Sequence, residues 1–330
     1  MTELAIAAFA AATGAHLLDE PRSSRFARFR ETFDEQAFLR RLAERGLRWV
    51  ARSDPAFPRR LGQIHDPPPG LFVRGEASLA LLDRPCVAVV GARACSSYGT
   101  AVALAFGNEL AAAGAVVISG LARGVDAAAH RGALEAGETV AVLGCGIDRD
   151  YPRAHAALAA AVAQRGLVVS EYPPGVEPAP WRFPARNRIV AGLALATVVV
   201  EARERSGALI TADLALDEGR EVLTVPGEIT SQLSRGTNQL LRLGATPATC
   251  AEDVLVAIGL EPASREPPPL DARLERVRAA VAGGASTGDA VVRRLDLAPG
   301  EVAAALAELE LLGVVAQAEG LYREVMPART

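Results

Sequence analysis

The sequence predicts an α/β protein whose core is a Rossmann-like, doubly wound parallel sheet. Two observations predict it: valine-rich apolar runs without polar alternation, and alanine-rich helical stretches between them. Strands that are apolar on both faces belong to a parallel sheet covered by helices, and repeated β–α units make it doubly wound. The expected strands are Cys86–Val90, Val116–Ser119, Thr139–Leu143, Leu167–Ser170, Thr197–Glu201 and Glu221–Val225, and two of the helices between them are Thr100–Ala113 and Val125–Ala136.

Residues 1–65, which precede this core, show short helical patterns and predict a small helical N-terminal region. One pattern is Gln36–Arg45, in which Phe38, Leu39 and Leu42 are spaced for one helix face. The segment DPPPG at 66–70 follows, and no helix crosses such a run of prolines. We therefore place the Rossmann-like core at 66–261.

The C-terminal section predicts a winged-helix domain over residues 271–330. A Pro-rich linker at 262–270 separates it from the core. Helical patterns cover 271–282, 286–294 and Pro299–Leu312, and Gly313 ends the third of them. Residues 314–322 then read as a hairpin with Gly320 at its turn, and three short helices with a hairpin describe a winged helix.

Composition excludes several classes of protein. No apolar run approaches the roughly 18 residues that span a bilayer, and the first residues lack a basic stretch ahead of the apolar one, so we expect a cytoplasmic protein. The cysteines are too far apart for a zinc site or a disulfide framework, and buried thiols are the better interpretation. They are Cys86, Cys95, Cys145 and Cys250.

The net charge of −4 argues at first against a nucleic-acid partner, but binding depends on local charge. All 35 basic residues are arginines, because the chain contains no lysine. Between Arg22 and Arg60, eleven arginines face five acidic residues, a local excess of +6. Either a binding surface or ordinary solvated helix faces would explain that excess.

In doubly wound sheets ligands bind at the carboxyl ends of the strands, so the loops there deserve inspection. The loop Gly91–Thr100 has the composition of a phosphate-binding loop: Gly91 permits close backbone approach, Arg93 is cationic, and Ser96 and Ser97 can hold an anion. It is neither the dinucleotide fingerprint GxGxxG nor a P-loop, so we expect no nucleotide cofactor.

The loop Ser119–His130 places Gly120 and Asp126 at the start of the next helix. A carboxylate there favours the helix dipole, so a capping role explains Asp126 well. Two later loops also follow strands, at 201–212 and 226–245, and each offers glycine and hydroxyl residues that suit a phosphate-lined groove.

The most informative segment is WRFPARNRIVAGL at 181–193. Arg182, Arg186 and Arg188 alternate there with Trp181, Phe183 and Asn187. Arginines beside aromatic rings suit single-stranded nucleic acid, because guanidinium groups neutralise phosphates and aromatic faces stack bases. Core anchors and a helix-start ion network would explain the same residues. We find no catalytic motif, neither GxSxG nor HExxH, and expect a protein that is not an enzyme.

Taken in order, these motifs resemble the DprA/Smf family of DNA-processing proteins. The resemblance runs from about residue 54 to 323. It rests on VAVVGAR, ISGLARGVDAAAH, AVLGCGIDRDYP, SEYPPG, FPARNRIVAGL, EARERSGALITADLAL and GTNQLLRLGA.

The resemblance implies a single-stranded-DNA-binding recombination mediator that protects incoming DNA and loads a RecA-type recombinase during natural transformation. It also implies self-association, as a homodimer through the core. The DNA-binding residues that it indicates are Gly91, Arg93, Gly120, Phe183, Arg186, Asn187, Arg188 and Ser206.

Two parts depart from the family pattern. The first loop reads Gly91-Ala92-Arg93 where GSR is usual, and ATGAHLLDEPRSS stands where many relatives carry a helix-hairpin-helix. The third helix of the winged-helix domain carries Glu301, Glu308 and Glu310 and no arginine, so we expect it to contact protein rather than duplex DNA.

Two other functions remain open at this point. One is a nucleotide phosphoribohydrolase on a similar sheet, whose motif PGGxGTxxE supplies a catalytic glutamate. The comparable position here is Leu240, which weakens that interpretation. The other is a protein adaptor without nucleic-acid binding, which the exposure of the arginine cluster would distinguish.

Overall fold

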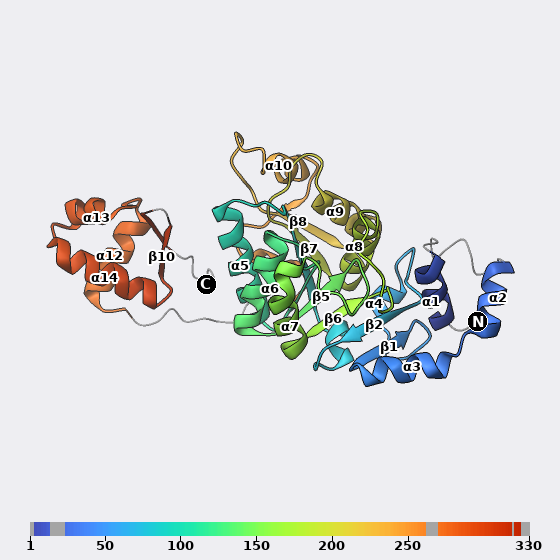
Figure 1. Ribbon diagram of the computed structural model, residues 1–330. Helices are drawn as coiled ribbons and strands as arrows, with labels where there is room; N and C mark the ends of the chain where they lie inside the picture. The colour runs from blue at the N-terminus through green and yellow to red at the C-terminus, as the bar shows by residue number, and fades with distance from the viewer. Residues whose placement is uncertain (1–2, 14–23, 262–269, 319, 325–330) are drawn as a thin grey trace. The chain divides into compact units, whose positions relative to one another are not determined.

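The structure is a computed structural model that describes residues 3–13, 24–261, 270–318 and 320–324 (Figure 1). The chain divides between residues 261 and 262 into two compact units. Apart from its last residue, the predicted linker at 262–270 lies outside the described residues. None of the described helices is long and apolar enough to cross a membrane.

The first unit is built on a sheet in the order β1-β2-β6-β5-β4-β3-β7-β8-β9 (Figure 1). From β6 to β9 neighbouring strands run parallel, whereas β2 runs antiparallel to β6 and to β1. The strands are β1 Leu47–Ala51, β2 Gly70–Arg74, β3 Cys86–Val90, β4 Val116–Ser119, β5 Thr139–Leu143, β6 Leu167–Ser170, β7 Ala196–Val199, β8 Glu221–Thr224 and β9 Thr246–Pro247.

The six predicted strands are therefore present, and the bounds of β3 to β6 are those expected. Apart from the exposed Glu221 at the start of β8, each is buried along its whole length, because alternate residues enter two different cores. In β3, Ala88 and Val90 belong to one hydrophobic cluster, and Val87 and Val89 belong to a second one on the other face. This is the physical reason that the strands lack polar alternation.

The N-terminal boundary differs from the predicted one. Strand β1 lies inside the region expected to be helical, and it pairs with β2 from Leu47 opposite Arg74 to Ala51 opposite Gly70. The prolines at 66–70 lead directly into β2 instead of separating two domains. This edge strand, LRWVA, is fully buried only at Leu47 and Val50 and contains the charged Arg48, so it lacks the continuous apolar run that marks the other strands.

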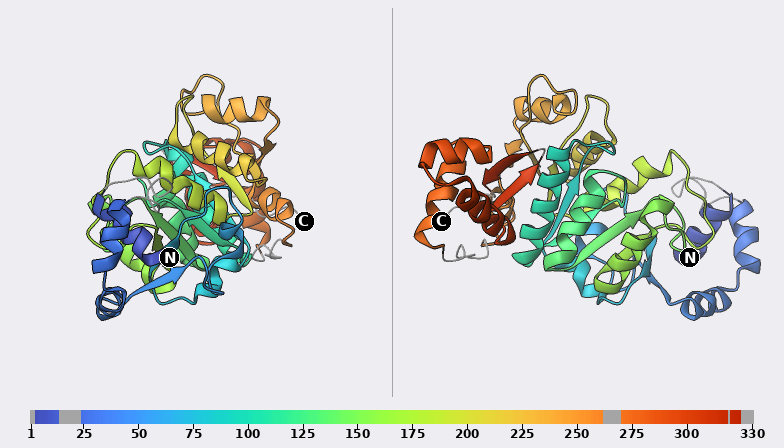
Figure 2. Two further views of the ribbon diagram at one scale, coloured as in Figure 1. Left: turned by 90° about the vertical axis from the view of Figure 1, so that its right-hand side faces the viewer. Right: turned by 60° about the vertical axis from the view of Figure 1, so that its left-hand side comes forward.

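Helices cover both faces of the sheet. The face formed by Val87 and Val89 carries α5 and α6, which lie side by side, together with α11, and continues to α1, α3 and α7 (Figure 2). The opposite face carries α4, α8, α9 and the 3₁₀ helix η1. The helices of this unit are α1 Glu3–Thr13, α2 Ser24–Thr32, α3 Glu35–Glu44, α4 Arg59–Gly62, η1 Leu79–Asp83, α5 Ser97–Ala112, α6 Val125–Ala136, η2 Arg153–His155, α7 Ala156–Arg165, α8 Arg182–Leu193, α9 Gly207–Asp217, α10 Arg235–Arg242 and α11 Ala251–Ala257.

Aromatic rings join the N-terminal helices to the sheet. Phe9 of α1 meets Phe29 of α2 at 5.3 Å between ring centroids, and Phe29 meets Phe33 at 5.2 Å. Phe38 of α3 follows at 5.6 Å from Phe33 and lies 6.4 Å from Phe72 of β2. The divergent segment at 14–23 lies outside the described residues.

The second unit has the elements expected of a winged helix: α12 Ala272–Ala282, α13 Gly288–Leu295, α14 Pro299–Leu311, and the antiparallel strands β10 Val315–Ala318 and β11 Leu321–Glu324. Its own core includes Val277, Val291 and Leu306. The three glutamates of α14 are exposed, and Glu308 pairs with Arg273 at 2.6 Å. Residue 319, next to the predicted turn, lies outside the described residues.

Candidate nucleic-acid interface

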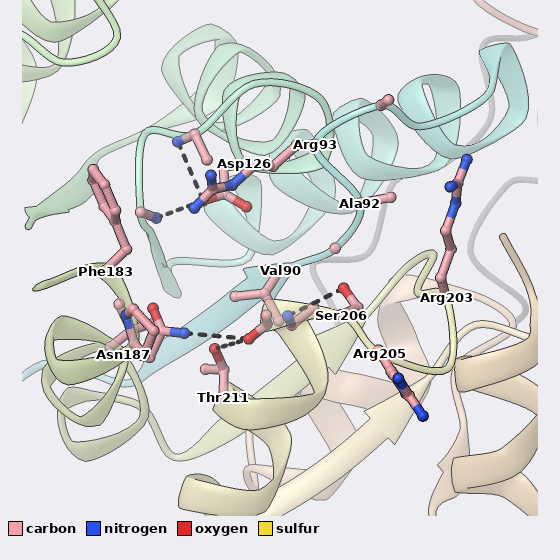
Figure 3. A pocket seen from close by; sticks show the side chains of 18 of the residues that line it. Val90, Ala92, Arg93, Asp126, Phe183, Asn187, Arg203, Arg205, Ser206 and Thr211 are labelled. Atoms are coloured by element: carbon pink, nitrogen blue, oxygen red, sulfur yellow. Dashed lines mark hydrogen bonds between the residues drawn. The ribbon is translucent and has the colours of Figure 1, made fainter. Parts of the chain in front are cut away.

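A pocket of about 370 Å³ opens at the carboxyl ends of β3 and β4. The sheet order reverses there, since β4 lies on one side of β3 and β7 on the other. Such a switch point is where doubly wound sheets bind their ligands. The lining comes from the loops after β3, β4 and β7 and from one face of α8 (Figure 3).

The structure brings most of the predicted DNA-binding residues together in this pocket. Those that line it are Gly91, Arg93, Gly120, Phe183, Arg186, Asn187 and Ser206. Arg188 is the predicted residue that does not line it.

Arg188 serves instead as an anchor between α8 and its neighbours. Its guanidinium pairs with Glu171 at 2.7 Å and with Asp66 at 2.8 Å, and its side chain is 13% exposed. Burial alone would lower the pKa of Arg188, but the two carboxylates raise it well above its ordinary value. The charge of Arg188 is thus paired inside the protein and away from the pocket lining, and its contact with DNA stays a prediction that these ion pairs do not favour.

Arg186 forms the cationic floor of the pocket. It is 4% exposed and donates a hydrogen bond to the carbonyl of Val142. Burial lowers the pKa of Arg186, and the charge of Asp126 opposes that effect. Arginine nevertheless stays protonated in proteins, so a positive charge lies directly beneath the pocket.

Gly120 lines the pocket beside the Arg186 guanidinium. A Cβ atom at this position would lie 2.4 Å from both terminal nitrogens of Arg186, so any larger residue would displace the guanidinium. Asp126 fixes the same turn, because its carboxylate accepts the backbone N–H of Gly120 at 3.1 Å and of Ala122 at 3.3 Å. Burial raises the pKa of Asp126, while Arg186 and these amides lower it. Asp126 therefore holds the loop before α6, and the expected capping of the helix's own amides is not what these hydrogen bonds do, because α6 has no side-chain cap.

Arg93 and Phe183 meet at one side of the pocket. The Arg93 guanidinium carbon lies 5.4 Å from the centre of the Phe183 ring, a cation–π contact. Arg203 and Arg205, which the prediction did not select, lie on the side opposite Phe183 (Figure 3). They follow β7 and stand directly before the predicted Ser206, so the position after a strand was the signal that could have found them.

Asn187 and Ser206 organise the helix ends that face the pocket. The Asn187 amide donates to the carbonyl of Gly207 at 3.2 Å, which joins α8 to the start of α9. Ser206 caps α9, since its hydroxyl accepts the N–H of Ala208 at 3.3 Å. Among the described residues, no carboxylate is hydrogen-bonded to the amides of Ser206, Gly207 or Ala208.

The amino end of α5, which we expected to hold an anion, is occupied by the protein itself. The Glu201 carboxylate accepts the N–H of Ser96 at 2.9 Å and its hydroxyl at 2.6 Å. Glu201 is 4% exposed. The anion position at the start of α5 is therefore occupied by Glu201, whereas no carboxylate occupies the start of α9 among the described residues.

The pocket is strongly cationic although the chain as a whole carries −4. Its lining contains Arg93, Arg186, Arg203 and Arg205 against Asp126 alone, so four positive charges minus one negative charge give +3. Arg93, Arg203 and Arg205 are exposed, and they form no ion pair among the described residues. At the position where the phosphoribohydrolase motif has its glutamate, Leu240 is buried in the apolar core.

Comparison with known proteins adds independent findings. Residues 48–259 match the family model described as DNA recombination-mediator protein A, and residues 261–320 match that of the DprA winged helix domain. The DNA processing protein DprA of Streptococcus pneumoniae is 46% identical over 207 residues, which cover 61% of this chain and 71% of that protein. Protein Smf of Escherichia coli is 39% identical over 307 residues, covering 87% of this chain and 82% of the relative.

Two solved structures are similar. The X-ray structure of DprA from Streptococcus pneumoniae matches with a TM-score of 0.66 and 37% identity, covering 79% of this chain and 93% of that one. A structure of DprA from Helicobacter pylori, described for its single-stranded DNA binding mode, matches with a TM-score of 0.57 and 32% identity, covering 61% and 92%. With both of its units matched, this chain belongs to the DprA/Smf family of DNA recombination-mediator proteins.

Proposed function

We propose that this protein binds single-stranded DNA in the pocket at the carboxyl ends of β3 and β4. The observation that carries the proposal is the charge of +3 on a pocket that also presents an aromatic ring, Phe183. Single-stranded nucleic acid is bound by that combination of cationic groove and aromatic surface.

Each part of the lining has a defined task in this proposal. The exposed guanidinium groups of Arg93, Arg203 and Arg205 neutralise phosphates of the strand. The amides of Ser206 and Gly207 at the start of α9, to which no carboxylate is hydrogen-bonded among the described residues, receive a further phosphate oxygen, because a helix amino end favours negative charge. Arg186 supplies a fixed positive field from below Gly120. The DprA of Helicobacter pylori, whose structure concerns single-stranded DNA binding, supports this assignment.

The family supports a role in DNA recombination, and we propose the specific steps by that analogy. The protein would protect single strands that enter during natural transformation and load a RecA-type recombinase onto them as a homodimer joined through its core. We propose no catalytic step for this role: Asp126, which lines the pocket, and Glu201, at the start of α5, both accept backbone N–H groups.

The test is a salt titration with fluorescent single-stranded and duplex oligonucleotides. We expect the wild type to prefer single strands, with a steep loss of affinity as salt rises. The double variant Arg93→Ala/Arg205→Ala should bind more weakly and flatten the logarithmic salt slope by about 1.4, or about 0.7 for each lost phosphate contact. Arg131→Ala is the matched control, since Arg131 is exposed and lies outside the pocket. Equal effects of both variants, or no binding by the wild type, would rule out the pocket as a DNA site.

A further inference from the structure

Beside the pocket, two aromatic rings form a stacked pair. Tyr151 and Phe183 have their ring centroids 5.3 Å apart and their planes inclined by 27°. Phe183 is enclosed further by the Arg93 guanidinium at 5.4 Å and by Gly144, where a Cβ would come within 2.9 Å of the ring. Tyr151 is the exposed member, with 42% of its surface accessible.

The segment that carries Tyr151 is held at several points. Asp148 pairs with Arg45 at 3.0 Å, and Asp150 pairs with Arg74 at 2.6 Å. Asp148 also accepts the N–H of Gly175 at 2.8 Å. The exposed ring is therefore fixed in place before any ligand arrives, which reduces the entropy lost on binding.

We propose that Tyr151 is a base-stacking residue, and that a base of the strand leaving the pocket packs on its exposed ring. This inference rests on the proposed binding of single-stranded DNA. Phe183, which the sequence suggested for stacking, is half-buried, and Tyr151, Arg93 and Gly144 already lie against parts of its ring. In this proposal the Phe183 ring packs under the Tyr151 ring, and the base stacks on the exposed face of Tyr151.

The exposure and bonding of Tyr151 favour this role over a purely structural one. Among the described residues its hydroxyl has no hydrogen-bond partner, so that group does not fix the fold. It does not line the pocket itself, although its partner Phe183 does. The position suits the next nucleotide along the strand, since stacking on an aromatic face accepts any base.

The experiment uses the full-length protein and oligothymidine strands that carry a single 2-aminopurine, moved one position at a time. Stacking quenches this base, so the wild type should show one position with strong quenching that Tyr151→Leu loses. Affinity should fall about tenfold in Tyr151→Leu, within the range for one stacked base, and stay within twofold in the matched control Tyr151→Phe.

Two results would overturn the inference. One is that the wild type and Tyr151→Leu show the same quenching at each position of the 2-aminopurine. The other is that Tyr151→Leu and Tyr151→Phe lose affinity equally. If Tyr151→Leu does not fold, photo-crosslinking of wild-type protein with 5-iododeoxyuridine gives the answer, because Tyr151 must then appear among the crosslinked peptides. A wild type that binds no single strand at all contradicts the proposed function instead, so the two failures can be distinguished.

Discussion

The Arg188 guanidinium grips the Glu171 carboxylate through two parallel hydrogen bonds of 3.0 and 2.7 Å. Glu171 is 1% exposed at the end of β6, so this pair ties α8 to the sheet. Only two residues earlier on the same helix, Arg186 faces the pocket. One short sequence, RNR, thus supplies one arginine to the proposed DNA site and another to the fold.

Arg188→Ala should lower the free energy of unfolding by about 3 kcal/mol, because it leaves a buried carboxylate without its partner. Urea denaturation at pH 7 measures this change, with the exposed Arg131→Ala as control. At temperatures where both variants are folded, we expect single-strand affinity within twofold of the wild type. A folded Arg188→Ala protein with an unchanged midpoint and weak DNA binding would show that Arg188 contacts DNA after all.

Gly120→Ala should weaken single-strand binding by at least tenfold, since the added methyl group must push Arg186 out of its position. Gly300→Ala is the matched control: Gly300 has no atom within 4 Å of its would-be Cβ. Fluorescence anisotropy of both variants provides the comparison. Wild-type affinity in Gly120→Ala would mean that the field of Arg186 plays no part in binding.

Burial lowers the pKa of His130 to about 3, so the folded state keeps this imidazole neutral. An unfolded chain titrates it near its usual value of about 6.5, so the unfolded state binds more protons between these two values. The stability that this residue contributes is therefore complete above about pH 6.5 and falls as the pH is lowered toward 3.

In His130→Gln that contribution is absent. The difference in unfolding free energy between wild type and variant should shrink by about 3 kcal/mol from pH 7 to pH 4. Urea titrations at four or five pH values in that interval give the slope. A difference that stays constant with pH would contradict a neutral, buried His130.

Removing the winged-helix unit, residues 262–330, should leave single-strand affinity within about twofold. The exposed glutamates of α14 repel a phosphate backbone, so duplex binding should not decrease either. Anisotropy with single-stranded and duplex probes, compared between the full chain and residues 1–261, tests both statements. A clear loss of duplex binding in residues 1–261 would show that the winged-helix unit contacts duplex DNA.

The sequence predicted the parallel strands well because each lies in a nearly continuous apolar run whose residues enter a core on both faces of the sheet. It did not predict β1, whose residues pair with β2 residues 19 to 27 positions further along the chain. Most of the pocket-lining residues could also be predicted, because the carboxyl ends of parallel strands lie at the same edge of the sheet and bring their loops together.

Arg188 was misplaced because charge composition says nothing about direction. Helix periodicity supplies that information: Phe183, Arg186, Asn187 and Val190 recur at intervals of three and four residues, and all four line the pocket. A residue at position 188 lies on another face of the same helix. Tyr151 was missed because no short-range pattern links it to Phe183.

The carboxylate of Glu201 at the start of α5 has a consequence for selectivity in a cell that is full of free nucleotides. A phosphate binds well at a helix amino end, and at the start of α5 that position is taken by this carboxylate. What remains in the proposed DNA site is the start of α9 and modest contacts spread over several arginines. In the proposed binding mode only a polymer engages all of them together, so a DNA strand is distinguished from its building blocks by many modest contacts at once.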